Sequence, residues 1–270
     1  MSKQSDYRNA LILGASSGFG AATALRLAKD GFNIFGVHLD RKATMGEVEK
    51  LIMKLKSYEV EVNYYNINAS DDEKRLGVIK DIRKRINEGH HITVLLHSLA
   101  FGTLKPFINK EREKALTKAN VTMTMDVMAH SLVYWTQELF WENLLGKGSR
   151  IFAMTSHGTD TVVPNYGAVS GAKAALENHI KQLAMELGKY GVTANAIKAG
   201  VTDTPALRKI PGNDKMVESA LKRNPSGRLT TPQDVANAIS ILSREESQWI
   251  SGGIINVDFG ESVIDRAEGE

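Results

Sequence analysis

Residues 9–29 read NALILGASSGFGAATALRLAK and indicate the architecture of the whole chain. They join an apolar run, a turn with three glycines and an Ala- and Leu-rich segment, which predicts a buried strand over 9–13 and a helix over 21–29. N–H groups at such a helix start point at phosphate, whose charge the helix dipole favours. Gly14 would allow the tight turn, Gly18 close approach of a ligand, and Gly20 close helix–strand packing. The turn therefore predicts a dinucleotide site, although its spacing, G-x-x-x-G-x-G, differs from the common G-x-G-x-x-G.

The remainder of the chain alternates between short apolar runs and longer amphipathic segments. The runs predict strands over 32–38, 60–67, 92–96, 149–155, 192–198 and 254–257. The amphipathic segments predict helices over 47–58, 71–88, 120–145, 164–187 and 231–242, with Pro164 and Pro232 in first turns. This alternation predicts an α/β fold: one Rossmann-type domain over residues 1–270, with a doubly wound parallel sheet of about seven strands and helices on both faces.

Composition excludes several classes of protein. Among 270 residues there is no cysteine, so disulfides and thiolate metal sites are excluded, and we expect no metal site. The net charge of +3 is too small to indicate nucleic-acid binding. The polar start has no signal-peptide core and no later run is long enough to cross a membrane, so we expect a cytoplasmic protein without a membrane partner.

Tyr166 and Lys173 form the most informative pair of side chains. They are seven residues apart, and seven helical steps of about 100° place both on one face, about 10 Å apart along the axis. A phenol beside an ammonium has its anionic form favoured, so we expect a lowered pKa for Tyr166. The alternative is a buried tyrosine and a lysine whose aliphatic stem covers apolar surface, both common on amphipathic helices.

The end of the second predicted strand bears on cofactor choice. Asp40 comes about two residues later than expected for an acid that binds the adenine ribose. Arg41 and Lys42 can meet a 2′-phosphate, or they belong to a solvated charged turn. The pattern favours NADP(H), and NAD(H) stays possible.

Further along, strand ends predict more of the cleft. Asn66 and Ile67 suit an adenine edge, and the turn after residue 96 should line the cofactor. His97 is interpreted as a packed, hydrogen-bonded residue, and the Met and Trp positions of 120–145 as core or subunit packing. Residues 207–228 predict a polar lid or binding loop, part of a mobile substrate loop at about 204–228, and a loose tail starts at Glu261.

Assembled, these residues resemble the short-chain dehydrogenase/reductase superfamily over essentially the whole length. The resemblance rests on the glycine motif, Asn66-Ile67, Ser156, Lys173, and Asn195-Ala196-Ile197 leading to Gly200 and Thr204. It implies a set of cofactor-binding residues: Gly14, Ser16, Ser17, Gly18, Phe19, Gly20, Asp40, Arg41, Asn66, Ile67, Ser98, Leu99, Ala100, Lys173, Gly200, Thr202 and Thr204.

Within that superfamily, the tyrosine spacing resembles one branch. Most members place tyrosine four residues before the lysine, where this chain has Val169. Tyr166, seven before Lys173, instead resembles the enoyl-acyl carrier protein reductase branch, as do His97-Ser98-Leu99-Ala100 and Pro164-Asn165-Tyr166. Two departures are Ser156, where the best-known members have a second tyrosine, and Asp126 in place of the usual asparagine, which leaves the proton-relay path open.

The resemblance implies reduction of the C=C bond of a 2-enoyl thioester by NAD(P)H. Catalytic roles then fall on Tyr166, Lys173 and Ser156, with the acyl group on acyl carrier protein or coenzyme A, and with a homotetramer packed through 120–145 and 166–187. One alternative is reduction of a ketone or 3-oxoacyl group by Ser156 and Tyr166. Another is a cofactor-binding sensor without turnover, against which the Tyr–Lys pair argues. Basic residues of 207–228 either meet an acidic carrier or coenzyme A phosphates, or are simply solvated: Arg208, Lys209, Lys215, Lys222 and Arg223.

Overall fold

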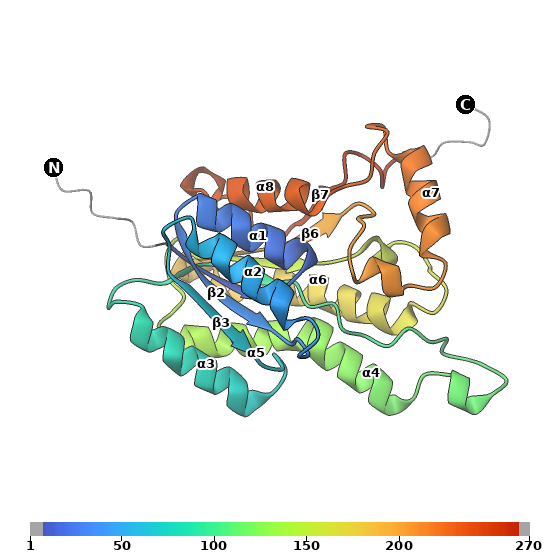
Figure 1. The fold of residues 1–270 in the computed structure, drawn as a ribbon, viewed down its shortest axis with the longest axis horizontal. Coiled ribbons are helices and arrows are strands. Elements are labelled where there is room, and N and C mark those ends of the chain that lie inside the picture. Colours follow the sequence, from blue (N-terminus) through green and yellow to red (C-terminus); the bar gives the residue numbers. More distant parts are fainter. Residues whose placement is uncertain (1–7, 265–270) are drawn as a thin grey trace.

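The computed structural model describes residues 8–264, and these form one seven-stranded sheet (Figure 1). The strand order is β3-β2-β1-β4-β5-β6-β7, and every neighbouring pair is parallel, which confirms the predicted Rossmann-type fold. The strands are β1 (Arg8–Leu13), β2 (Phe32–His38), β3 (Val62–Asn66), β4 (Ile92–His97), β5 (Arg150–Met154), β6 (Thr193–Ala199) and β7 (Ile254–Val257).

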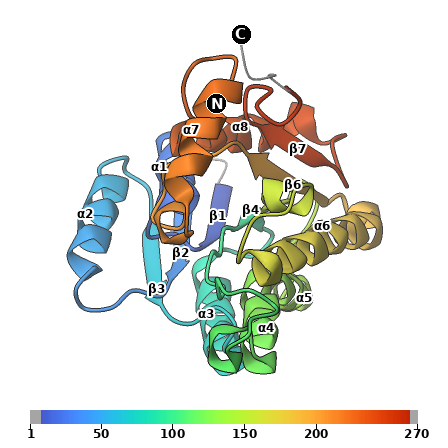
Figure 2. The same cartoon turned by 90° about the vertical axis from the view of Figure 1, so that its right-hand side faces the viewer.

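Helices cover both faces of this sheet (Figure 2). One face carries α1 (Gly18–Lys29), α2 (Met45–Lys56) and α8 (Pro232–Leu242). The other carries α3 (Asp72–Arg85), α4 (Lys118–Met125), α5 (Ser131–Trp141) and α6 (Gly167–Leu187). A further helix, α7 (Asn213–Arg223), lies beyond the end of β6 (Figure 1). None of the helices within residues 8–264 combines the length and apolar character of a membrane-spanning segment.

The central strands are buried on both sides, which explains their nearly continuous apolar sequence. Along β1, Leu11 and Leu13 join the hydrophobic cluster of one face, and Ala10 and Ile12 join that of the other. Trp135 of α5 is completely buried, and its indole N–H donates to the Ala69 carbonyl over 2.8 Å. Burying one large apolar side chain contributes about 1.5–3 kcal/mol, so two such layers fix the sheet and hence the strand ends that carry the site.

The predicted helix over 120–145 is interrupted and shorter. Residues Asp126–His130 form a π-helical turn between α4 and α5, and α5 ends at Trp141. Asn143 then has φ of 54°, a left-handed conformation that asparagine tolerates and that ends helices. The prediction of one regular helix was therefore wrong in detail, although the segment packs against α6.

Two expectations about local structure in the C-terminal third were also wrong, whereas the mobility and substrate role predicted for 204–228 stay predictions. The segment 207–228 is largely helical, with a 3₁₀ turn at Leu207–Lys209 followed by α7, because Ala220 and neighbouring apolar side chains give it a packed face. Glu261 is buried, and its Oε1 accepts from the Val201 N–H over 3.2 Å, so the chain is not loose there. Residues 1–7 and 265–270, the polar start and the rest of the predicted tail, lie outside the described residues.

Candidate active site

The glycine-rich turn between β1 and α1 packs very closely against the backbone around it. Gly14 has φ of 88°, and a Cβ atom there would lie 2.4 Å from the Ser98 carbonyl oxygen. A Cβ atom on Gly20 would lie 2.0 Å from the Gly14 oxygen, so only glycine lets the helix start this near the strand. Ser17 precedes α1 without capping it through its side chain. First-turn N–H groups are thus left without a side-chain cap, which fits a phosphate ligand.

The end of β2 is tied to both the glycine-rich turn and β3. The Asp40 carboxylate accepts from Thr44 Oγ1 over 2.8 Å and lies 3.0 Å from His38 Nδ1. Burial alone would raise the pKa of Asp40, but hydrogen bonds from Ser16, Thr44 and His38 lower it. Asn66 Nδ2 donates to the Asp40 carbonyl over 3.0 Å. The structure therefore brings together three predicted cofactor-binding residues, Ser16, Asp40 and Asn66, and the Asp40 carboxylate places a negative charge among them.

Arg41 and Lys42 follow directly. Both are exposed, and within residues 8–264 neither side chain has a hydrogen-bond or ion-pair partner. They are therefore available to an anionic ligand at this rim.

Lys173 lies in the interior below the carboxyl ends of β4 and β5. Its Nζ donates to the Met154 carbonyl over 2.7 Å and to the Leu99 carbonyl over 3.4 Å. Burial lowers the pKa of Lys173 to about 8. Ser98 N donates to the Leu13 carbonyl over 2.8 Å, so the turn after β4 joins the glycine-rich turn to Lys173.

Tyr166 precedes α6 rather than standing within it, because the helix begins at Gly167 and not at Pro164. Residues 163–166 form a turn in which Tyr166 N donates to the Val163 carbonyl over 3.2 Å and Asn165 has φ of 63°. The Tyr166 hydroxyl donates to Ser156 Oγ over 3.3 Å. The predicted catalytic tyrosine and serine therefore meet.

The expected lowering of the Tyr166 pKa is wrong. Burial raises the pKa of this phenol, and the hydrogen bond with Ser156 lowers it by less. Lys173 is engaged by two carbonyls instead of lending its charge to the phenol. Tyr166 is therefore protonated at neutral pH and acts as a hydrogen-bond donor.

Val169 occupies the position where most short-chain reductases have tyrosine, and its side chain does not reach the surface. It is buried in the core, and a Cβ atom on Gly102 would lie 2.7 Å from its Cγ2. Tyr166 is therefore the phenol that the start of α6 offers to this site.

Two further residues considered in the sequence, His97 and Asp126, make no hydrogen bond with the Tyr166 hydroxyl among the described residues. His97 is fully buried, with Nε2 2.8 Å from Ser131 Oγ, and burial followed by the charge of Lys173 lowers its pKa to about 3. Its interpretation as a structural residue is confirmed. Asp126 interacts with Tyr134, one helical segment along, and among the described residues no hydrogen bond joins it to Tyr166 or Lys173. No relay through Asp126 is therefore defined.

The remaining predicted positions surround the glycine-rich turn or its neighbours. A Cβ atom on Gly18 would lie 3.7 Å from Thr204 Cγ2, so the segment after β6 reaches that turn. Gly200 N donates to the Val257 carbonyl over 3.2 Å, and Thr202 and Thr204 are buried. Phe19, Ile67 and Ser98 are half-buried, whereas Ser17 and Ala100 are exposed.

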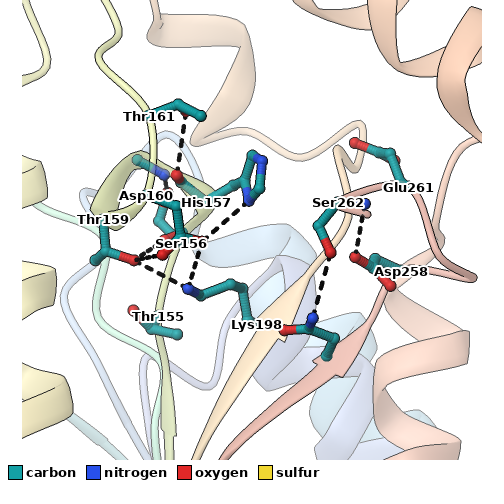
Figure 3. A network of polar contacts seen from close by, with 12 residues as sticks. Thr155, Ser156, His157, Thr159, Asp160, Thr161, Lys198, Asp258, Glu261 and Ser262 are labelled. Carbon is teal, nitrogen blue, oxygen red and sulfur yellow. Dashed lines mark hydrogen bonds and ion pairs between the residues drawn. The ribbon is translucent and has the colours of Figure 1, made fainter. Parts of the chain in front are cut away.

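Sequence reasoning missed a charged cluster beside Ser156 (Figure 3). Lys198 on β6 contacts Asp160, after β5, and approaches Glu177 on α6. A lysine within the apolar strand ANAIKA was the available signal, since a charge in a buried strand requires a partner.

A parallel sheet of seven strands with a glycine-rich turn at its carboxyl edge is the architecture of oxidoreductases of the short-chain dehydrogenase/reductase type, which use a nicotinamide cofactor. A family model described as enoyl-(acyl carrier protein) reductase matches residues 14–262, and the chain belongs to this family.

The names of individual relatives state different reactions. Enoyl-(acyl-carrier-protein) reductase (NADH) FabI of Aquifex aeolicus is 30% identical over 191 residues, covering 69% of this chain and 68% of that protein. The NADPH-named FabI of Staphylococcus aureus is 28% identical, covering 81% and 82%. The BbsD subunit of a hydroxy(phenyl)methyl-succinyl-CoA dehydrogenase of Thauera aromatica is 27% identical, covering 95% and 97%. The solved Aquifex aeolicus enoyl reductase superposes with a TM-score of 0.82 at 25% identity, covering 96% and 98%.

Proposed function

We propose that this protein reduces the C=C bond of a 2-enoyl thioester with NAD(P)H. The observation that carries the proposal is Tyr166, a half-buried phenol that donates to Ser156, while the alternative tyrosine position is filled by the buried Val169. The relatives named FabI support the same reaction.

The chain's own residues would act on charge that develops in the substrate. Bound NAD(P)H would supply a hydride to the β-carbon of the enoyl group. Hydride addition there would shift the C=C electrons onto the thioester oxygen, and a proton taken from water would then add at the α-carbon. Tyr166, kept protonated by its raised pKa, donates a hydrogen bond to the developing oxyanion. Removing one such preorganised donor typically costs about 3 kcal/mol of activation free energy.

Lys173 and the glycine-rich turn would hold the cofactor. The first-turn N–H groups of α1 suit the pyrophosphate, and the Lys173 ammonium suits the nicotinamide ribose hydroxyls. The exposed cations Arg41 and Lys42 favour a 2′-phosphate, so we propose a preference for NADP(H). The ionised carboxylate of Asp40 would repel that phosphate, so it supports NAD(H) as the competing cofactor.

A second candidate is reduction of a ketone or 3-oxoacyl group. It is favoured by the Ser156 hydroxyl, which lies 3.3 Å from the Tyr166 hydroxyl and can help to bind a carbonyl oxygen. The BbsD relative, named as a dehydrogenase of a coenzyme A ester, supports this alternative.

The acyl carrier and the assembly belong to the same proposal. Acyl carrier protein or coenzyme A would present the thioester. Arg208, one of the basic residues predicted to meet that carrier, is exposed and pairs with Asp203, with Nε 2.7 Å from Oδ1, so binding an anionic carrier there would compete with this ion pair. We propose a homotetramer packed through the α4–α5 segment and α6. Analytical ultracentrifugation tests that assembly.

One experiment separates the two reactions. Crotonyl and acetoacetyl thioesters are each offered with NADH and with NADPH, and cofactor oxidation is followed by absorbance. The proposal expects oxidation with crotonyl thioester. Turnover of the acetoacetyl thioester alone would establish the carbonyl reaction instead.

A further inference from the structure

A buried lysine lies beside the turn that carries Ser156 (Figure 3). The Lys198 side chain is 6% exposed, and its Nζ donates to Asp160 Oδ2 over 2.7 Å and to Thr159 Oγ1 over 3.0 Å. Glu177 Oε1 lies 3.5 Å from the same nitrogen. An ammonium is disfavoured in the interior unless anionic and polar partners surround it, and here two carboxylates and a hydroxyl do so.

The cluster connects four parts of the fold. Glu177 on α6 accepts from Thr155 Oγ1 over 2.7 Å, and its Oε1 lies 3.0 Å from Thr159 Oγ1. Burial alone would raise the pKa of Asp160, but the hydrogen bond and charge of Lys198 lower it, so Asp160 stays ionised. The end of β5, the turn after it, α6 and β6 are thus joined through one cation.

That turn sets the surroundings of the Tyr166 phenol. Gly158 N donates to Ser156 Oγ over 3.1 Å, and Thr159 N donates to the Ser156 carbonyl over 3.1 Å. A Cβ atom on Gly158 would lie 2.7 Å from Cε1 of Tyr166, so the turn also contacts the ring. Displacing Thr159 and Asp160 would therefore move both the hydroxyl and the backbone that orient Tyr166.

We propose that Lys198 is a positioning residue, which holds the Ser156–Asp160 turn against Tyr166 and thereby sets kcat. This inference rests on the proposed function for its kinetic consequence, although the anchoring itself does not. If Lys198 served packing alone, it could be replaced by an apolar residue once its buried carboxylate partner, Glu177, was also neutralised. A positioning residue cannot, because the turn would lose its link to β6.

The test compares Lys198→Met with the charge-relieved double variant Lys198→Met/Glu177→Gln, because Glu177 is the carboxylate left buried and unpaired, whereas the Asp160 side chain is 49% exposed and stays solvated. For Lys198→Met we expect kcat with crotonyl thioester to fall about tenfold or more, because small displacements of reacting groups carry large rate costs. The KM for cofactor should stay within roughly twofold, and Tm should fall. In the double variant Tm should recover while kcat stays low. Recovery of kcat together with Tm would overturn the proposal, since a purely structural role predicts that the two move together.

A matched control is Arg150→Met, which removes a buried cation at the opposite end of β5, where, among residues 8–264, Arg150 donates only to main-chain carbonyls. It should lower Tm and leave kcat within roughly twofold. If Lys198→Met does not fold, Asp160→Asn alone neutralises the half-exposed carboxylate nearest to Lys198 Nζ and should lower kcat about threefold.

Hydrogen exchange separates this inference from the proposed function. In Lys198→Met the amides of Gly158 and Thr159 should exchange about tenfold faster than in wild type, with the β5 amides unchanged. Unchanged exchange at both amides would overturn the anchoring. A wild-type protein that reduces no enoyl thioester would overturn the proposed function, while the exchange measurement still decides the role of Lys198.

Discussion

The hydroxyl of Tyr166 donates to Ser156 Oγ over 3.3 Å, and this contact joins the residue before α6 to the turn after β5. Because burial raises the pKa of Tyr166, its proton stays in place at neutral pH. A protonated phenol can donate a hydrogen bond to an oxyanion without first taking up a proton. The relationship therefore suits a hydrogen bond to a substrate oxygen on which negative charge develops.

Replacing Tyr166 with Phe tests this directly. The variant keeps the ring and loses the donor, so we expect kcat/KM for crotonyl thioester to fall by about 10²–10³-fold. Cofactor affinity, measured by fluorescence titration, should stay within roughly twofold, because the proposed cofactor contacts lie on Lys173 and the glycine-rich turn. A Phe variant with wild-type turnover would remove Tyr166 from the reaction.

Ser156→Ala distinguishes the two candidate reactions. A lost neutral hydrogen bond is worth about 1 kcal/mol, so reduction of crotonyl thioester should fall about fivefold through poorer orientation of Tyr166. If the serine instead binds a reacting carbonyl, reduction of acetoacetyl thioester should fall by about 10² or more. Thr161→Ala, in the same turn and further from the phenol, is the control. Equal losses with both thioesters would contradict a reaction-specific role for the serine.

Much of the fold follows from local patterns in the chain. The bounds of β2 and β7 agree with those predicted, because apolar runs between turn residues mark buried parallel strands clearly. The region of α7 was predicted as a loop because its polar surface and flanking Pro211, Gly212 and Pro225 obscure a narrow packed face around Ala220. Such a face is defined by the neighbours it meets, which no local pattern contains.

The site was predictable in its residue types and less so in its electrostatics. The spacing of Tyr166 and Lys173 identified two residues that the structure places at one end of the sheet. It could not show that main-chain carbonyls would engage Lys173, or that burial would outweigh any nearby charge at Tyr166. The partners of Lys198 on β6 come from two other elements, the turn after β5 and α6, so only the folded chain reveals that cluster.

Cofactor preference depends on the rim after β2. Arg41→Ala removes an exposed cation that has no partner among residues 8–264, and we expect KM for NADPH to rise about tenfold while KM for NADH stays unchanged. Lys50→Ala, which removes an exposed lysine paired with Glu47 on α2, is the matched control and should change neither value. An equal effect of Arg41→Ala on both cofactors would contradict a 2′-phosphate contact.

The buried ammonium of Lys173 makes the stability of the cofactor-free protein depend on pH. Burial lowers the pKa of Lys173 from 10.5 to about 8, so the folded state releases this proton before the unfolded chain does. Between these two pH values the unfolded chain binds more protons, and the free energy of unfolding therefore rises with pH. Below pH 8 both states are protonated, and the cost of the buried charge is fully present.

Comparison with Lys173→Met isolates this effect. The free energy of unfolding of wild type minus that of the variant should increase between pH 8 and 10.5, by up to about 3 kcal/mol, because each unit of pKa shift corresponds to about 1.4 kcal/mol. Urea titrations at pH 7, 8.5 and 10 measure the difference, and the subtraction cancels tyrosines and surface lysines that titrate in both proteins. A difference that is flat over this range would mean that Lys173 reaches water in the folded protein, and its proposed place in the wall of the cofactor site would then be wrong.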